Sequence, residues 1–156
     1  MLRKSLIAAA AGIAVLGLAP LAATPALAAP KPAVSVERDG FAVQGHDPVA
    51  YFTQGAPVAG RADLTATYRG ATFRFATPQN RAAFLADPAR YAPQYGGYCA
   101  WAAAQGYTAP GRAEHWRIVN GKLYLNYDGG VQRRWERDVP GFIAKADANW
   151  PGILSK

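Results

Sequence analysis

Cys99 is the only cysteine in this sequence, and it stands in the stretch GGYCAW. The glycines before it and the stop at Gly106 predict a helix that begins near Tyr98. In the first turn of such a helix, the positive end of the helix dipole would lower the pKa of the thiol. A thiolate there could bind a soft metal ion or act as a nucleophile. The opposing interpretation is a buried cysteine that packs as a small apolar side chain.

His46 is the best candidate for a second metal ligand, because it directly precedes Asp47-Pro48, a predicted helix start. A Cys99–His46 pair could bind copper as Cu(I) with two ligands, or zinc with water or another residue completing the coordination. A histidine before a helix cap is more often a packing or exposed residue than a ligand, so that interpretation stays open. His115 ranks below His46 because a predicted hairpin directs it to a polar face.

Three aromatic residues accompany the cysteine. Tyr95, Tyr98 and Trp101 follow one another at spacings of three residues and could line a pocket. Gly96-Gly97 interrupts any helix on which they would share a face, so packing in the core is the simpler explanation.

Patterns typical of enzymes are absent from the sequence. It has no carboxylate pair suited to acid–base work, no second cysteine for a dithiol centre and no Gly-rich phosphate loop. The sequence therefore favours a non-enzymatic protein, although a single reactive thiol stays open as a redox alternative.

The first 28 residues predict a secretory signal peptide that is cleaved. Arg3 and Lys4 precede an apolar run over 6–18, and Ala26-Leu27-Ala28 has the small residues of a cleavage site. Two prolines interrupt the apolar stretch, which favours cleavage over a membrane anchor. We therefore expect an exported protein, periplasmic or secreted, with no stable membrane anchor after cleavage.

The net charge of the chain limits the classes of partner that we expect. The net charge is +7, and it falls to +5 without Arg3 and Lys4. That excess is modest, and the basic residues near position 133 are interspersed with acidic ones, so no nucleic-acid partner is expected. A metal ion, copper or zinc, and another periplasmic protein are the partners that we expect.

The remaining chain suffices for one domain. Residues 29–40, with their prolines, predict an extended leader, and residues 41–156 predict a domain of hairpins and short helices. A helix is expected over 78–86, with Phe84 and Leu85 as its core residues. The fold class is therefore α+β with antiparallel strands.

Two hairpins are predicted from their turns. Around Arg69-Gly70, alternation sets Ala66 opposite Phe73 and Leu64 opposite Phe75. Around Asn120-Gly121, it sets Trp116 opposite Leu125 and Ile118 opposite Leu123, which places His115 on the other face.

The segments GHDPVAYF, YRGATFRFATPQNRAAFLADPARYAP, QYGGYCAWA and KADANWP resemble the exported bacterial proteins of the YHS-domain family. The first two match the YHS module proper, over about residues 45–93, and the others match a C-terminal extension of one branch. The resemblance implies a small fold of hairpins and helix related to heavy-metal-binding cysteine modules.

The resemblance also identifies where this chain departs from metal-binding members of the wider family. Those members have cysteines after an Asp-Pro-Val and in a Phe-Cys-Ser-x-x-Cys segment. Ala50, Ala76 and Asn80 stand at these positions here, and none supplies a thiolate. The function of that metal site therefore cannot be carried over through these residues.

Three interpretations follow. The first is a non-enzymatic binding protein that handles a soft metal, copper first, through Cys99 with His46 as second ligand. The second is a structural or protein-interaction module in which Cys99 is buried. The third is a single-thiol redox protein.

Overall fold

The computed structural model describes residues 29–156, so the predicted signal peptide lies outside the described residues. Within them no helix is long and apolar enough to cross a membrane. The elements follow in the order η1 (Val43–Gly45), α1 (Ala50–Thr53), β1 (Arg61–Tyr68), β2 (Ala71–Phe75), α2 (Pro78–Ala86), α3 (Pro88–Tyr91), η2 (Gln94–Gly97), α4 (Ala100–Ala104), β3 (Arg112–Val119), β4 (Lys122–Asn126), α5 (Gly129–Trp135), α6 (Val139–Asn149) and η3 (Gly152–Ser155).

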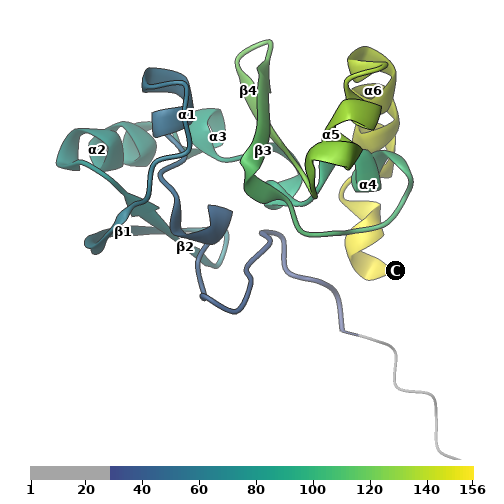
Figure 1. The fold of residues 1–156 in the computed structure, drawn as a ribbon. Coiled ribbons are helices and arrows are strands. Elements are labelled where there is room, and N and C mark those ends of the chain that lie inside the picture. Colours follow the sequence, from purple (N-terminus) through teal and green to yellow (C-terminus); the bar gives the residue numbers. More distant parts are fainter. Residues whose placement is uncertain (1–28) are drawn as a thin grey trace, which may run out of the picture.

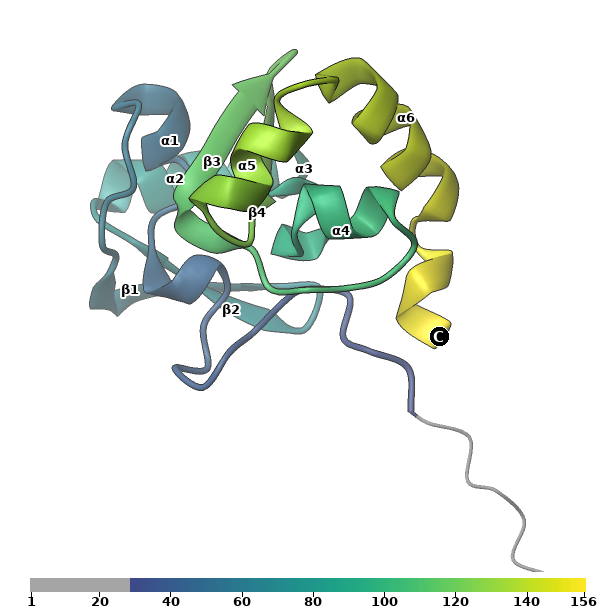
Figure 2. The ribbon, with the colours of Figure 1, turned by 45° about the vertical axis from the view of Figure 1, so that its right-hand side comes forward.

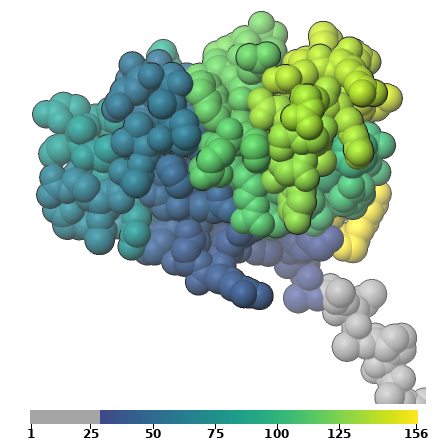
Figure 3. Space-filling model, in the orientation of Figure 1, coloured from purple at the N-terminus to yellow at the C-terminus, as the bar shows by residue number. Residues whose placement is uncertain are grey.

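Two antiparallel hairpins and short helices form this α+β fold, as the sequence predicts. Figure 1 shows α1, α2 and the β1–β2 hairpin on one side, α4, α5 and α6 on the other, and the β3–β4 hairpin between them. The same division is visible in the space-filling view of Figure 3, where the green hairpin separates the teal half from the yellow half.

The first hairpin has the expected register near its turn and departs from it further along. Ala66 pairs with Phe73 as predicted, but Phe75 pairs with Arg61 and not with Leu64. The register shifts between Arg61 and Thr65, and an irregularity of this kind leaves residues on one strand unpaired. The predicted pairing of Leu64 with Phe75 is therefore wrong, because alternation alone does not reveal a bulge.

The second hairpin has the predicted register throughout its turn-proximal part. Trp116 pairs with Leu125, and the turn residues Asn120 and Gly121 have φ values of 50° and 72°. Positive φ at both central residues is the requirement of a type I′ turn, which Asn-Gly meets at low cost.

Helix α2 begins at a cap that the sequence indicates. The Asn80 N–H donates to the Thr77 hydroxyl, 3.1 Å away, and Pro78 occupies the first turn. Phe84 is fully buried, whereas 49 % of Leu85 is exposed. The prediction of Leu85 as a core residue is wrong, because adjacent helical residues point about 100° apart and only one of them can face the core.

The β3–β4 hairpin separates two hydrophobic cores. The first core packs both hairpins against α2 and includes Leu123 and Leu125. The second packs around Trp135 between α4, α5 and α6, and includes Tyr124. Since successive side chains of a strand point to opposite faces, β4 contributes alternately to the two cores. Figure 2 shows α5 lying over this hairpin.

The segment expected as an extended leader packs against the domain. Val34 is buried in the first core, and the Ser35 N–H donates to the Gly96 carbonyl at 2.8 Å. The Lys31 N–H donates to the Leu154 carbonyl, also at 2.8 Å. The residues just after position 28 therefore lie beside the C-terminal η3.

Candidate functional site

Cys99 lies at the junction between the Gly96-Gly97 turn and α4. It is the N-cap residue and not a first-turn residue, and the Ala102 N–H donates to its Sγ at 3.5 Å. Its own N–H donates to the Ala109 carbonyl at 2.8 Å. The residue is fully buried. These contacts fix the thiol where α4 meets the loop that precedes β3.

Asn126 is a polar side chain in contact with the thiol. Its Oδ1 lies 3.7 Å from Cys99 Sγ and accepts the Trp101 N–H at 3.3 Å. Asn126 is fully buried, and its Nδ2 has no hydrogen-bond partner within the described residues. The thiol therefore has a neutral amide as neighbour, and half of that amide is unsatisfied.

Burial raises the pKa of the Cys99 thiol above its ordinary value, and the Asp128 carboxylate acts in the same direction. Backbone N–H groups of Ala102, Tyr127 and Trp101 lower this pKa by a smaller amount. The expectation of a lowered pKa is therefore wrong. A five-residue helix offers little stabilisation of a thiolate compared with the cost of removing that charge from water.

Cys99 is one of the residues that line a small apolar hollow of about 200 Å³, and we call it the Cys99 hollow. Its walls include the rings of Trp101, Tyr107 and Tyr127 and the side chain of Val131. Tyr107 and Tyr127 are partly exposed, so this hollow lies near the surface of the protein.

His46 lies in the other half of the molecule, just before α1. Its Nδ1 is 3.2 Å from the Val43 carbonyl oxygen and 3.1 Å from the Gln44 carbonyl oxygen. Its backbone forms a bridge with Ala59. No contact joins His46 to Cys99, and residues 29–156 contain no group of three His, Cys, Asp or Glu side chains arranged to hold a metal ion.

The aromatic residues that precede α4 are core residues with polar ends. Tyr95 donates its hydroxyl to Asp147 Oδ1 at 2.8 Å, and Tyr98 donates to the Pro32 carbonyl at 3.0 Å. Burial raises the pKa of both phenols. Trp101 is half-buried and lines the Cys99 hollow. Of these three aromatic residues, Tyr95 and Tyr98 therefore pack in the core, and Trp101 lines a hollow.

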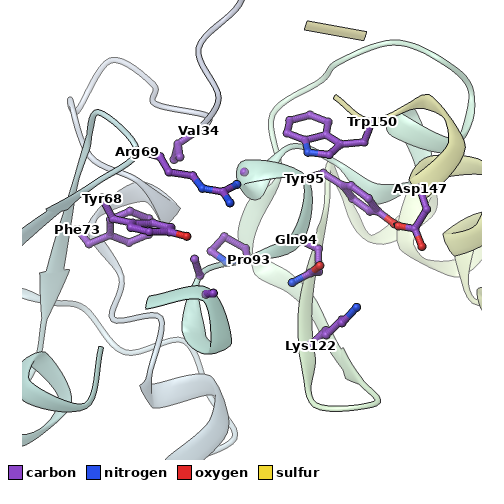
Figure 4. A pocket seen from close by; sticks show the side chains of 13 residues that line it. Val34, Tyr68, Arg69, Phe73, Pro93, Gln94, Tyr95, Lys122, Asp147 and Trp150 are labelled. Carbon is purple, nitrogen blue, oxygen red and sulfur yellow. The ribbon is translucent and has the colours of Figure 1, made fainter. Parts of the chain in front are cut away.

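Tyr95 also lines a second hollow of about 310 Å³, between the β1–β2 turn, the β3–β4 turn and α6. Figure 4 shows its side chains. We call it the junction pocket and define it by the residues Tyr68, Arg69, Tyr95, Lys122, Asp147 and Trp150.

A buried carboxylate forms the polar centre of the first half. Asp47 is fully buried, and its Oδ1 accepts the N–H groups of Val49 and Ala50 at 2.8 and 3.3 Å. Its Oδ2 accepts the Ala76 N–H at 2.8 Å and the Asn80 Nδ2 at 2.7 Å. The sequence predicts Asp47 as the N-cap, whereas α1 begins at Ala50 with Val49 as its N-cap, although Asp47 still accepts N–H groups at this helix start. The sequence does not reveal the two long-range donors, because no local signal marks them.

Residues 49–95 match the family model of the YHS domain. This chain contains a YHS domain. No curated protein and no solved structure matches the chain. The YHS domain covers α1 to α3 and both strands of the first hairpin, so Cys99 and His46 lie outside the matched residues.

The three positions at which the resemblance places cysteines meet at one point in the structure, the carboxylate of Asp47. Ala50, Ala76 and Asn80 each donate to the carboxylate of Asp47. Two of these donors are backbone N–H groups and the third is an amide side chain. Where the resemblance implies thiolates around a metal, this chain has a hydrogen-bonded carboxylate.

Proposed function

We propose that this YHS-domain protein is a non-enzymatic binding or interaction module in which Cys99 is a structural side chain. The observation that carries the proposal is the complete burial of Cys99 beside a neutral amide. A thiol held away from water and with a raised pKa is a poor nucleophile and a poor proton-releasing ligand.

Cysteine labelling tests this proposal. We expect native protein to react with iodoacetamide at pH 7.5 only as fast as it unfolds, with full labelling in denaturant. The matched control carries Cys99→Ala and Ala144→Cys, which moves the only thiol to an exposed position on α6. The control should be labelled rapidly. Rapid labelling of native Cys99, at a rate that does not follow unfolding, would contradict the proposal and favour the single-thiol redox alternative.

A second candidate function is the handling of a soft metal, copper first, through Cys99. The observation that favours it is the Cys99 hollow, a space of about 200 Å³ lined in part by the only cysteine. His46 is not among the residues that line this hollow, so an external ligand would complete the coordination.

Metal titration separates the two candidates. Reduced protein without residues 1–28 is titrated anaerobically with Cu(I) and Zn(II) under native mass spectrometry. Under the leading proposal, no one-metal complex tighter than about micromolar forms. A tight complex that Cys99→Ala abolishes and His46→Ala preserves would replace the leading proposal with the second candidate.

We further propose that the protein is exported, on the strength of the signal-like residues 1–28. Cell fractionation after expression in a Gram-negative host tests this. Full-length chain should yield a shortened protein outside the cytoplasm, whereas a chain lacking residues 2–28 should stay inside. Recovery of uncleaved full-length protein in the membrane fraction would contradict cleavage.

A further inference from the structure

The junction pocket has the size and position of a ligand site. Its volume of about 310 Å³ lies at the lower end of the range of small-molecule pockets, which is about 300–1,000 Å³. The YHS domain contributes Tyr68 and Arg69, and the C-terminal part contributes Lys122, Asp147 and Trp150. Sites between two such units are common places for ligands.

Two cations line this pocket against one carboxylate. Neither Arg69 nor Lys122 forms a salt bridge in the part of the chain that the structure describes. Asp147 already accepts the Tyr95 hydroxyl through Oδ1. Within the described residues these two positive charges are therefore not held in a salt bridge, and one oxygen of the only acidic group in the pocket is occupied by Tyr95.

The chain conformation holds the arginine at the pocket. Arg69 has a φ of 50° in the tight β1–β2 turn, and its guanidinium lies 5.3 Å from the centre of the Tyr68 ring. Figure 4 shows the guanidinium and the Tyr68 hydroxyl pointing from one side toward the amide of Gln94. An arginine held against an aromatic ring loses less conformational freedom when it binds an anion.

Apolar surface adjoins these polar ends. Phe73 and Pro93 are buried in the floor, and the indole of Trp150 lies on the side opposite Arg69 (Figure 4). An arginine fork next to aromatic walls suits a carboxylate carried on a flat apolar body, because the fork binds both carboxylate oxygens and the rings contact the body.

We propose that the junction pocket binds a small organic carboxylate with an aromatic or other flat apolar body. Arg69 binds the carboxylate, Lys122 adds charge at the edge, and Tyr68 and Trp150 contact the body. This inference goes beyond the proposed function, since it does not depend on whether Cys99 is structural or binds a metal.

Calorimetric or NMR titration with three matched probes tests the charge requirement. The probes are phenylacetate, phenylacetamide and phenethylamine, which share a body and differ in charge. We expect saturable one-to-one binding of phenylacetate with a dissociation constant below about 1 mM, and at least about tenfold weaker binding of the other two. Equal binding of the amide or tighter binding of the amine would overturn the proposal, as would the absence of saturable binding by the carboxylate.

Variants test the location. Arg69→Gln should weaken phenylacetate binding by about tenfold or more, because it removes a charge-assisted hydrogen bond. Ala89→Phe, which enlarges an exposed residue of the pocket wall, should abolish binding without changing charge. Arg134→Gln removes an exposed arginine from α5, outside the pocket, and should have no effect. Equal losses in Arg69→Gln and Arg134→Gln would indicate general surface attraction and overturn the proposal.

Discussion

The two halves of the molecule each bury one polar centre, and the two centres are built differently. In the N-terminal half, the Asp47 carboxylate accepts four hydrogen bonds at 2.7–3.3 Å. In the C-terminal half, Cys99 and Asn126 make contacts of 3.5 and 3.7 Å, and one amide nitrogen has no partner within residues 29–156. The first centre is fully satisfied and the second is not.

The difference shows where each half derives its stability. A buried charge is tolerated only when hydrogen bonds replace the water that it loses, so Asp47 must join α1, β2 and α2 to remain in the core. A neutral thiol needs no such partners and can be held by packing alone. Truncating the side chain of Asp47 should therefore destabilise the fold strongly, whereas truncating that of Cys99 should mainly leave a small cavity.

The largest effect is expected from Asp47→Ala. It leaves the Asn80 amide and three backbone N–H groups without their acceptor, and we expect a loss of about 3–5 kcal/mol in the free energy of unfolding. Urea unfolding followed by tryptophan fluorescence measures it. Asp63→Ala is the matched control, because Asp63 forms only an exposed pair with Arg61, and we expect it to leave the free energy of unfolding nearly unchanged. Similar losses in the two variants would remove the distinction between the centres.

A pair of identical substitutions compares the two centres directly. Asn80→Leu removes a donor to a buried carboxylate and should cost about 2–3 kcal/mol. Asn126→Leu removes an unpaired Nδ2, which should stabilise the protein, and it also removes the acceptor of the Trp101 N–H, which should destabilise it. Because these effects oppose each other, we expect the free energy of unfolding to change by no more than about 1 kcal/mol. Chemical denaturation of both variants measures the difference. A greater loss in Asn126→Leu than in Asn80→Leu would reverse the comparison.

Cys99→Ala should cost about 1–2 kcal/mol, because it removes one buried sulfur atom and leaves a small cavity. Thermal unfolding at neutral pH under reducing conditions measures it. A loss above about 4 kcal/mol would indicate a role for the thiol beyond packing.

The smallest effect concerns pH. Because burial raises the pKa of Cys99, the unfolded chain releases the thiol proton at a lower pH than the native protein does. The contribution of the Cys99 thiol to the free energy of unfolding is complete below its pKa in the unfolded chain, about 8.5. This contribution is lost as the pH rises from there through the pKa of the thiol in the native protein. The stability difference between the parent and Cys99→Ala should therefore shrink between about pH 8 and 10. A difference that grows over this interval would mean that the native thiol is stabilised as a thiolate.

Sequence reasoning succeeds where structure is determined locally. The Asn120-Gly121 turn requires positive φ and so determines the register of the second hairpin, and the Thr77 cap determines where α2 begins. It fails where contacts with another segment of the chain determine the local structure. The bulge near Thr65 and the exposure of Leu85 both depend on how neighbouring elements pack.

The candidate sites follow the same rule. Sequence identifies Cys99 as the residue to test, but its burial depends on Ala109 and Asn126, which are 10 and 27 residues away. The donors to Asp47 from Ala76 and Asn80 come from 29 and 33 residues away, and no spacing rule connects them.

The docking of the segment around Lys31 against Leu154 has a consequence for synthesis. The two backbone groups that meet there lie 123 positions apart in the chain. A ribosome delivers Lys31 long before Leu154, so the hydrogen bond between them can form only after η3 has been made. A nascent chain shortened before η3 lacks this contact, and we expect its segment around Lys31 to be more accessible to proteases than that of the full chain.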